Sequence, residues 1–340
     1  MVGTATRRDR WGLVRPACLA LLLLLTGCAS ALQPMGPAVT APDLDDQRLR
    51  AADGYSLPLR AWTPEIAPPR AVILALHGFN DYSNAFDGPG KRWAARGIAT
   101  YAYDQRGFGA SANTGIWPGT PTLVADLRMA VAQLRRRHPQ QPLFLLGESM
   151  GGAVVLSALS DPAAPLAVDG AILVAPAVWG RETMGVVPRV ALWLSDSLVP
   201  GFVVHPPREL GIEPSDNLPM LRALGRDPLV IKGARVDALA GLTDLMDRAL
   251  AACPQLDTPA LVLFGAHEQV LPPGPVQRAL STLESNPRHR LAVYPKGYHM
   301  LLRDLAATTV IDDIAAWISD PAAPLPSGAD RTPRRLLAEP

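Results

Sequence analysis

The residues that point most directly to chemistry occupy positions 147–151, where Gly-Glu-Ser-Met-Gly matches the pattern Gly-x-Ser-x-Gly. An apolar run precedes the pattern directly, and a segment of small residues typical of a helix follows it. In this strand–turn–helix setting a sharp turn exposes the serine hydroxyl, and the flanking glycines prevent collisions with neighbouring backbone. We therefore expect Ser149 to be a catalytic nucleophile; the alternative is a glycine-rich turn without chemistry.

A serine hydroxyl is a weak nucleophile until a base accepts its proton, and a histidine late in the chain is the expected base. Of the six histidines, His299 is the one that follows the last predicted strand and lies in a short glycine-containing loop. The others lie at helix or strand ends, in an inserted segment, before the last strand or in another motif: His77, His138, His205, His267 and His289. We expect His299 to be the general base.

A carboxylate must orient the imidazole and stabilise its charged form. The order serine, acid, histidine places this carboxylate between the other two residues. Glu268 is the only carboxylate in the loop 265–272, which follows a predicted strand. Asp244 and Asp247 are alternatives, but they lie on a helical stretch where a solvent-exposed face is the expected position. We therefore predict Glu268 as the third catalytic residue.

The tetrahedral intermediate of such a reaction needs hydrogen-bond donors for its negative charge. His77, Gly78 and Phe79 end the first recognised apolar strand, where a backbone N–H can turn toward the active site. We expect the backbone N–H groups of Phe79 and Met150 to form the oxyanion hole. Because this chemistry uses protein groups only, we expect no cofactor and no metal.

Apolar runs alternate with helical segments from about residue 55 onward. Predicted strands cover residues 71–77, 97–103, 142–147, 168–177, 259–265 and 289–294, and predicted helices cover residues 122–138, 150–159, 276–283 and 305–318. Strands that are buried on both faces and separated by helices indicate a mostly parallel α/β sheet flanked by helices.

The alternation is interrupted once, at residues 179–256, which are apolar and biased toward helix without a clear strand. We predict a helical cap over the C-terminal edge of the sheet, inserted between the two parts of the core, residues 49–178 and 257–320. The alternative is that the segment forms more of the core. Residues 321–340 are proline-rich, and we expect a disordered tail there.

The N-terminus has the features of an export signal, with a basic start followed by the apolar run 18–25. This run is too short to span a bilayer. Two small residues at 26–27 precede Cys28, as in a bacterial lipobox, where the cysteine thiol is acylated; the alternative is an ordinary signal peptide with a chance cysteine. We predict a signal peptide at 1–27 and a tether at 28–48, which would place the domain at the bacterial cell envelope, on the periplasmic face of the outer membrane.

The composition excludes several classes of protein. Lys and Arg number 32 and Asp and Glu number 31, so no concentrated basic face is expected and nucleic acid is not a predicted partner. Of the three cysteines only Cys253 lies in the expected folded part, which excludes an internal disulfide framework. Hydrophobic residues make up 48% of the chain, enough for a large buried core.

Taken together, the motifs resemble the monoglyceride lipase and lysophospholipase family of α/β hydrolases, within the serine aminopeptidase S33-like group. The resemblance covers about residues 50–320 and is carried, in order, by His77-Gly78, residues 104–111, residues 147–152, the loop from Gly265 and the late His299. It implies the α/β-hydrolase fold with a helical cap inserted after the sixth strand. It also implies Ser149, Glu268 and His299 as the triad, and a mainly structural role for the turn at 104–111.

The sequence departs from this family at two places. The family usually carries aspartate where this chain has Glu268; glutamate is one methylene longer but can still reach a histidine N–H. Relatives often have a small residue followed by Glu-His where this chain has Phe79, Asn80 and Asp81. A bulky Phe79 would narrow the acyl or alcohol pocket.

These features predict a serine carboxylic-ester hydrolase that acts through an acyl-enzyme on Ser149. The apolar cap suggests a fatty-acyl chain and the predicted anchor places the enzyme beside lipids, so monoacylglycerols or lysophospholipids fit both observations. Two alternatives stay open. One is non-ester chemistry on the same fold, such as perhydrolysis or C–C bond hydrolysis. The other is a non-catalytic lipoprotein that binds lipid or a protein partner through the cap.

Overall fold

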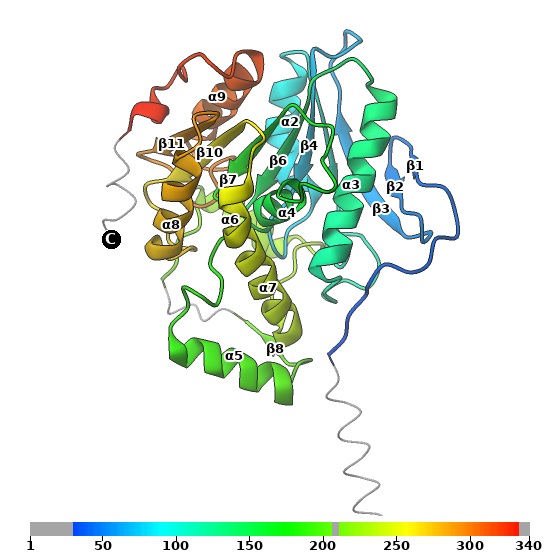
Figure 1. The fold of residues 1–340 in the computed structure, drawn as a ribbon, viewed down its shortest axis with the longest axis vertical. Helices are drawn as coiled ribbons and strands as arrows, with labels where there is room; N and C mark the ends of the chain where they lie inside the picture. The colour runs from blue at the N-terminus through cyan, green and yellow to red at the C-terminus, as the bar shows by residue number, and fades with distance from the viewer. Residues whose placement is uncertain (1–29, 206–210, 333–340) are drawn as a thin grey trace, which may run out of the picture.

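The computed structural model describes residues 30–205 and 211–332 (Figure 1), so Cys28 and the predicted signal peptide lie outside the described residues. Within the described part, nine strands form one sheet in the order β1-β2-β3-β5-β4-β6-β7-β10-β11. These strands are β1 (Asp43–Leu44), β2 (Arg48–Arg50), β3 (Ser56–Trp62), β4 (Ala71–Leu76), β5 (Ile98–Tyr103), β6 (Leu143–Glu148), β7 (Gly170–Val174), β10 (Ala260–Gly265) and β11 (His289–Tyr294).

Strands β4, β5, β6, β7, β10 and β11 pair in parallel, whereas β1, β2 and β3 join the sheet antiparallel at the edge next to β5. The mostly parallel sheet predicted from the sequence is therefore confirmed. The three antiparallel strands were not predicted. β1 and β2 are very short, and in β3 buried residues alternate with exposed ones over only part of the strand. None of the three strands therefore gives a continuous apolar run in the sequence.

Helices cover both faces of the sheet, as Figure 1 shows. The helices around the sheet are α2 (Asp87–Ala94), α3 (Thr120–Arg137), α4 (Met150–Leu159), α8 (Pro273–Glu284) and α9 (Ala307–Ser319), with short 3-10 turns η1 (Ser83–Phe86), η3 (Cys253–Gln255) and η4 (Ala329–Arg331). Successive residues of β4 enter different cores: Val72 and Leu74 pack on the side of α3, α4 and α8, and Ile73 and Ala75 on the side of α2 and α9. Burial on both faces explains why the central strands are continuously apolar.

The cap segment follows β7, the sixth strand of the sheet when the two-residue β1 is left out. It contains α5 (Val186–Leu198), the hairpin strands β8 (Val203–Val204) and β9 (Ala234–Arg235), α6 (Leu218–Arg226) and α7 (Val236–Ala252). Leu245 and Ala249 of α7 are buried in the main core, while no residue of α5 or α6 is buried. The segment thus combines a core helix with an outer cap. No described helix is both long and apolar enough to cross a bilayer.

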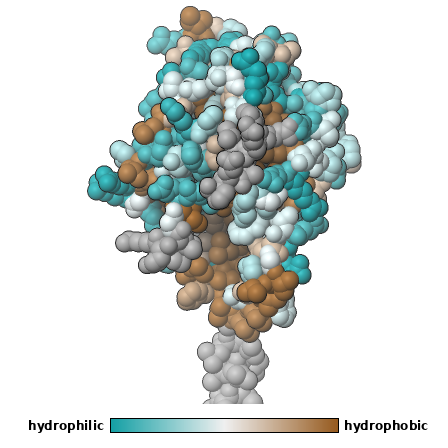
Figure 2. All heavy atoms as spheres, turned by 90° about the vertical axis from the view of Figure 1, so that its left-hand side faces the viewer, coloured by the Kyte–Doolittle hydropathy of each residue, from teal (hydrophilic) through white to brown (hydrophobic). Residues whose placement is uncertain are grey.

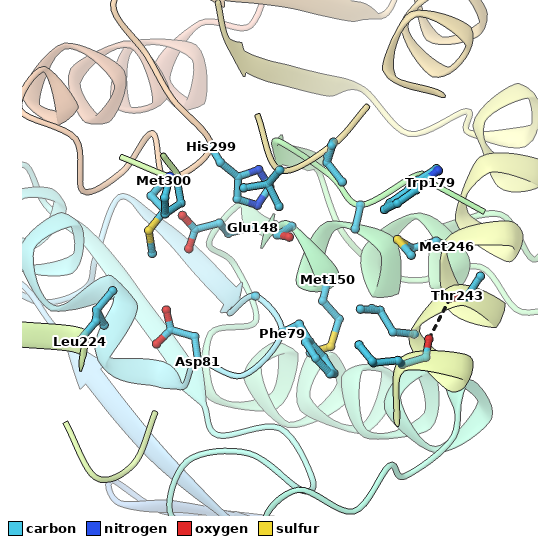
Figure 3. Close-up of a pocket in the computed structure, with 18 of the residues that line it drawn as sticks. Phe79, Asp81, Glu148, Met150, Trp179, Leu224, Thr243, Met246, His299 and Met300 are labelled. Carbon is cyan, nitrogen blue, oxygen red and sulfur yellow. Dashed lines mark hydrogen bonds between the residues drawn. The ribbon is translucent and has the colours of Figure 1, made fainter. Parts of the chain in front are cut away.

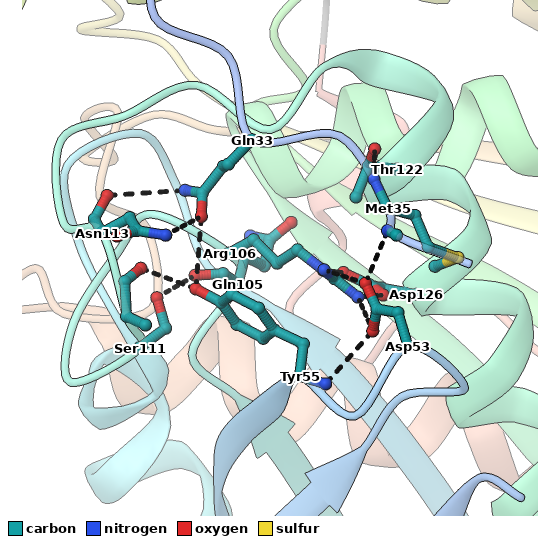
Figure 4. A network of polar contacts seen from close by, with 12 residues as sticks. Gln33, Met35, Asp53, Tyr55, Gln105, Arg106, Ser111, Asn113, Thr122 and Asp126 are labelled. Atoms are coloured by element: carbon teal, nitrogen blue, oxygen red, sulfur yellow. Dashed lines mark hydrogen bonds and ion pairs between the residues drawn. The ribbon is translucent and has the colours of Figure 1, made fainter. Parts of the chain in front are cut away.

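Residues 30–36, called the strap below, lie along the domain (Figure 1). The N–H of Ala31 donates to Oδ2 of Asp237 at 3.0 Å. The side-chain amide of Gln33 donates to the carbonyl oxygen of Ile116 in the loop after β5 at 2.6 Å, and Figure 4 shows Gln33 beside Asn113 of the same loop. The structure therefore differs from the expected tether at 28–48, because the described residues of that segment hydrogen-bond to the domain and include β1.

The C-terminal segment also differs from its expectation. Leu325 and Ala329 are buried against the sheet face covered by α9, and Asp330 pairs with Arg290 of β11 at 2.7 Å. Residues 321–332 are therefore packed on the domain, whereas the sequence suggested a disordered tail. The packing occurs because apolar residues between the prolines are buried against the core. The remainder of that tail lies outside the described residues.

The turn at 104–111 is built around a buried charge network (Figure 4). The guanidinium of Arg106 donates to Asp53 at 2.7 and 3.0 Å and to Asp126 at 2.7 and 3.1 Å. All three side chains are almost fully buried, and the Arg106 guanidinium also lies over the ring of Tyr55. The network joins the N-terminal strands, the turn and α3 into one unit.

Removing this arginine is expected to destabilise the fold strongly. Arg106→Ala leaves two carboxylates buried without their partner, which typically costs about 3–5 kcal/mol of unfolding free energy. Urea denaturation measures the loss. Arg96→Ala is the matched control, since its pair with Asp312 is partly exposed and such pairs contribute about 1 kcal/mol or less. Equal, small losses in both variants would contradict a central role for the network.

Candidate active site

Ser149 lies in a one-residue turn between two buried elements, because β6 ends at Glu148 and α4 begins at Met150. Its φ of 53° is in the left-handed region, which costs a non-glycine residue roughly 1–3 kcal/mol. Two hydrogen bonds to the chain after β6 hold this conformation. The N–H of Ser149 donates to the carbonyl of Val174 at 2.9 Å, and its carbonyl accepts from the N–H of Ala177 at 3.0 Å.

Glycines make this turn sterically possible. A β-carbon on Gly147 would lie 2.5 Å from the backbone of Gly151, and one on Gly151 would lie 2.2 Å from the carbonyl oxygen of Leu76. Neither contact can be relieved by a flexible side chain, because both involve backbone atoms. The two glycines of the motif are thus required by the close approach of strand and helix, as the sequence pattern indicated.

His299 and Glu268 form a direct pair on neighbouring loops. The Nδ1 atom of His299 lies 2.7 Å from Oε2 of Glu268, and both side chains are more than nine-tenths buried. The second carboxylate oxygen, Oε1, accepts from the N–H groups of Val270 and Leu271 at 2.7 and 3.0 Å. One oxygen of the glutamate therefore orients the imidazole while the other fixes its own loop.

Burial is the largest single influence on both groups and disfavours their charged forms, but the attraction and hydrogen bond between them and the smaller favourable contacts together outweigh it. Burial raises the pKa of Glu268, whereas the adjacent His299 and two backbone N–H groups lower it, and the net pKa lies below the ordinary value. Burial lowers the pKa of His299, whereas Glu268 raises it, and the net pKa lies above the ordinary value. His299 is therefore a stronger base than a free imidazole, as proton transfer from a serine requires.

The loop that carries His299 is held by the cap segment. Asp304 accepts from the N–H of Tyr298 at 2.7 Å and from the hydroxyl of Ser215 at 2.6 Å. The side-chain amide of Asn217 donates to the carbonyl oxygen of the residue before Asp304 at 2.8 Å. Residues of the cap segment thus help to position the candidate base.

The alternative acids lie elsewhere. Asp244 and Asp247 of α7 both pair with the guanidinium of Arg181, and Asp244 is largely exposed. Structural contacts likewise occupy several of the other histidines. For example, Nε2 of His138 lies 2.9 Å from the hydroxyl of Tyr101. Among the carboxylates considered from the sequence, Glu268 is the one in contact with His299.

The turn after β4 lies directly beside the nucleophile. A β-carbon on Gly78 would lie 3.3 Å from Cβ of Ser149. His77 is fully buried and fixes this turn, because its Nε2 accepts from the N–H of Gln105 at 3.0 Å while its Nδ1 lies 2.8 Å from the carbonyl oxygen of Gly78.

Met150 is the first residue of α4, and the first N–H groups of a helix have no partner within it. Phe79 and Met150 both line the cavity at Ser149, as an oxyanion hole requires.

A cavity of about 590 Å³ lies between the carboxyl ends of the strands and the cap (Figure 3). Ser149 and His299 both line it. Most of the wall is apolar and comes from the cap segment and neighbouring loops, with Trp179, Leu192, Leu239, Leu242, Met246 and Leu271 among the contributors. The apolar wall provides a site for a hydrocarbon chain.

One end of the cavity is charged. Arg303 pairs with Asp81 at 2.7 Å and with Glu148 at 3.3 Å, and all three residues line the cavity. In Figure 3 the carboxylates of Asp81 and Glu148 lie on the side of the pocket toward Met300 and Leu224, opposite Trp179 and Thr243. Within the described residues, Oε1 of Glu148 has no hydrogen-bond partner. Burial raises the pKa of Glu148, and the nearby Arg303 opposes that shift without cancelling it.

This charged group was missed in the sequence. Glu148 lies inside the serine motif, Asp81 was noted only as a departure, and Arg303 follows His299 by one helical turn of sequence without any motif. The sequence does contain a signal for this cluster, because an ionisable residue lies within a few positions of each of three segments predicted to be catalytic: the turn at His77–Phe79, the serine motif and the loop of His299.

A strained serine turn between a strand and a helix of a mostly parallel sheet is the defining feature of the α/β hydrolases. The comparison with protein families agrees with the geometry. The model of the Hydrolase_4 family, described as serine aminopeptidase, S33, matches residues 67–306. The chain belongs to this family.

Individual relatives are lipases. The chain is 28% identical to the monoacylglycerol lipase of Mycolicibacterium smegmatis over 280 residues, 78% of this chain and 93% of the relative. It is 27% identical to the monoglyceride lipase of Rattus norvegicus over 296 residues, 85% of this chain and 95% of the relative. The structure of a soluble variant of monoglyceride lipase from Saccharomyces cerevisiae, in complex with a substrate analog, matches with a TM-score of 0.68 at 19% identity, covering 83% of this chain and 98% of its own.

These findings confirm the predicted fold, the family resemblance and the class of enzyme. The protein is a serine ester hydrolase of the monoglyceride lipase type, with the α/β-hydrolase fold. The catalytic roles of Ser149, Glu268 and His299 remain predictions, and the geometry makes them directly testable.

Replacing Glu268 is expected to impair turnover without unfolding the domain. Glu268→Gln keeps the size of the side chain but removes the charge that stabilises protonated His299, and loss of a triad carboxylate typically lowers kcat about 10⁴-fold. Glu268→Asp is the matched control, because it keeps the charge and should retain more activity. Steady-state kinetics on a soluble ester measures both, and a fully active Glu268→Gln would show that another acid serves His299.

The pH dependence of kcat/KM provides a second readout. His299 must be neutral to accept the serine proton, so activity falls as pH decreases through its raised pKa, above the usual value of about 6.5. The Glu268→Gln variant lacks the carboxylate that most strongly raises the pKa of His299. Its residual activity should therefore fall only at a lower pH than that of the wild type. An unchanged limb would contradict the coupling of the two side chains.

Proposed function

We propose that this enzyme hydrolyses esters of one fatty-acyl chain with a small neutral polyol, with monoacylglycerols as the preferred class. The observation that carries the proposal is the cavity at Ser149, which is apolar along most of its wall and charged at one end. Its volume of about 590 Å³ lies within the range of roughly 300–1,000 Å³ typical of small-molecule sites. The names of the relatives from Mycolicibacterium smegmatis and Rattus norvegicus support the same class.

The charged end of the cavity favours a neutral polyol over a phosphate-containing alcohol. Asp81 and Glu148 supply two carboxylates, and the guanidinium of Arg303 is already paired with both. Both side chains line the cavity, and their carboxylates can accept hydrogen bonds from glycerol hydroxyls. A lysophospholipid would instead bring its phosphate next to two carboxylates, a like-charge arrangement that disfavours binding.

The proposed reaction has two stages, acylation and deacylation of Ser149. Oγ of Ser149 attacks the acyl carbon while His299 accepts its proton, and the N–H groups of Phe79 and Met150 bind the oxyanion. His299 then gives the proton to the departing alkoxide, which leaves as the free alcohol. Water, deprotonated by His299, attacks the acyl carbon and releases the fatty acid from Ser149.

A substrate panel tests this assignment. The kcat/KM for glycerol monoesters should rise by at least about tenfold from the acetate to the palmitate ester, because each buried methylene adds binding energy. A lysophosphatidylcholine of the same acyl chain should be turned over more slowly, and Asp81→Asn should narrow that difference. Ser149→Ala is the control for background turnover.

Two results of the panel would overturn the proposal. A series that favours only acetate esters would remove the lipase assignment. A clear preference for the lysophospholipid would remove the role given to the two carboxylates.

The proposal also includes a lipid anchor at Cys28, which holds the enzyme at the periplasmic face of a bacterial outer membrane. Its support is the sequence: a basic start, a short apolar run, two small residues and then the cysteine. Two or three acyl chains on one residue suffice for stable attachment, whereas a single chain is marginal. The anchor would bring the enzyme to its lipid substrate.

Membrane fractionation tests the anchor. Cys28→Ser should move the enzyme from the membrane to the soluble fraction, because no acyl chain can be attached. Cys18→Ala, within the apolar run of the signal, is the matched control and should stay with the membrane. Unchanged sedimentation of Cys28→Ser would refute acylation at this residue.

A further inference from the structure

One buried tryptophan links the turn after β4 to the cap segment. Trp117, in the loop after β5, is only 3% exposed. Its ring packs against those of Phe79 and Phe108, with centroids 6.4 and 6.5 Å away, within the range of favourable aromatic pairs. The ring also reaches α7, because a β-carbon on Gly241 would lie 2.2 Å from its Nε1. Trp117 therefore fills the space between Phe79 and a helix that forms part of the cavity wall.

The backbone of Phe79 depends on contacts of this kind. Its N–H is the candidate oxyanion donor, and the next residue, Asn80, has a left-handed φ of 65°. A non-glycine residue keeps such a conformation only where surrounding contacts hold it. The carbonyl of Asn80 accepts from the N–H of Ile231 at 2.9 Å, and the ring of Phe79 lies edge to face against that of Phe108 at 5.6 Å. Because the ring and the N–H of Phe79 share one Cα atom, a ring that loses its support lets the direction of the N–H change.

The strap holds the backbone of Trp117. The N–H of Gln33 donates to the carbonyl oxygen of Trp117 at 3.0 Å, and Leu32 pairs with Trp117 in an isolated parallel bridge. The side-chain amide of Gln33 donates to the carbonyl oxygen of Ile116 at 2.6 Å, and Nδ2 of Asn113 donates to Oε1 of Gln33 at 3.3 Å (Figure 4). Two residues of the strap therefore fix the end of the loop from which the Trp117 ring projects.

The strap also reaches the start of α7. The N–H of Ala31 donates to Oδ2 of Asp237 at 3.0 Å, and Asp237 is buried in the first turn of α7. Leu239 and Leu242, further along the same helix, line the cavity at Ser149. One short segment thus joins the loop that carries Trp117 to the helix on which its ring packs. The strap lies outside residues 67–306, the part of the chain that matches the family.

We infer that the strap and Trp117 position the oxyanion hole. The strap holds the backbone of Trp117, the ring of Trp117 supports that of Phe79, and the N–H of Phe79 thereby keeps its direction toward the oxyanion. Trp117 is a positioning residue, because it acts through Phe79. The inference rests on the predicted role of the Phe79 N–H as an oxyanion donor. It is independent of the choice of substrate, since every ester that Ser149 attacks forms the same oxyanion.

Trp117→Ala removes the support for Phe79. Loss of an oxyanion donor lowers kcat by about 10²–10³-fold, and a displaced donor should lose part of this, about tenfold. We expect this fall in kcat on a soluble short-chain ester with an unchanged KM, because the oxyanion is absent from the bound substrate. Trp117→Phe keeps an aromatic ring at this position and should retain most of the rate. Rates are expressed per active site, counted by fluorophosphonate labelling of Ser149.

A transition-state analogue measures the hole directly. Oγ of Ser149 adds to the carbonyl carbon of a trifluoromethyl ketone, its proton passes to His299, and the ketone oxygen becomes an oxyanion in the hole. The affinity of Trp117→Ala for this inhibitor should fall by the same factor as kcat/KM. An unchanged affinity together with a lower kcat would overturn the inference. So would a higher KM with an unchanged kcat, which would assign Trp117 to the acyl wall instead.

Trp193→Ala is the matched control. Trp193 of α5 is 67% exposed, at the cap end of the molecule, where Figure 2 shows apolar residues gathered. The substitution removes the same side chain from the surface instead of from the contact with Phe79. The kcat and the inhibitor affinity should therefore stay at the wild-type values, and equal values in the two tryptophan variants would overturn the role of Trp117.

Cutting the strap tests its part in a protein that has already folded, whether or not Trp117→Ala folds. A protease recognition sequence inserted between Pro37 and Ala38, which are both exposed, allows the strap to be cleaved from the folded enzyme. The cleaved segment is no longer tethered, so its effective concentration at the Trp117 loop falls and it dissociates on dilution. The kcat should then fall about tenfold together with the inhibitor affinity, while KM stays. A synthetic peptide of residues 30–36, added in excess, should restore both.

The outcomes of the cleavage are distinct. Unchanged kcat after complete cleavage and gel filtration would overturn the part given to the strap. Failure of the proposed function would look different, because all these readouts use a soluble ester. A wild-type enzyme that shows these effects but does not turn over monoacylglycerols would refute the proposed substrate and leave the positioning role supported.

Discussion

At Ser149 the chain leaves a buried strand and enters a buried helix within one residue, so backbone atoms of Gly147, Gly151 and Leu76 come into near contact. The left-handed backbone at Ser149 persists because the strand order fixes it: its N–H and carbonyl are both bound by the chain at and after β7. The same turn places Met150, the first residue of α4, directly after Ser149, and its N–H has no partner within the helix. The positions of the candidate nucleophile and of the candidate oxyanion donor are thus both set by the backbone.

The candidate base is positioned in a different way. His299 lies on a loop, and side chains from separate parts of the chain hold it there: Glu268 on its imidazole, and Asp304 with Ser215 on its loop. The two oxygens of Glu268 have separate contacts, one with the imidazole and one with the backbone of its own loop. The position of His299 therefore depends on contacts between core and cap, whereas that of Ser149 depends on the sheet and on the segments that directly follow β6 and β7.

The sequence was sufficient for features that local pattern determines. The glycines around Ser149 and the continuous apolar strands follow from steric and hydrophobic rules that act over a few residues. The strap was not predictable, because it is held by backbone hydrogen bonds to Asp237 and to distant loops, which leave no periodic pattern. The cluster of Asp81, Glu148 and Arg303 was missed for the same reason, since only the folded chain brings these charges together.

Helix α5 shows why the cap was the hardest segment to interpret. A helix that is apolar on most of its circumference belongs either in a protein core or in contact with lipid, and sequence pattern cannot separate the two. The neighbouring α7 is a core helix and packs on α4. In contrast, α5 lines the cavity with one side and is exposed on the other within the described part of the chain. The sequence of α5 therefore could not decide between these two positions, and only the folded chain shows a helix that lines the cavity with one side and exposes apolar side chains on the other.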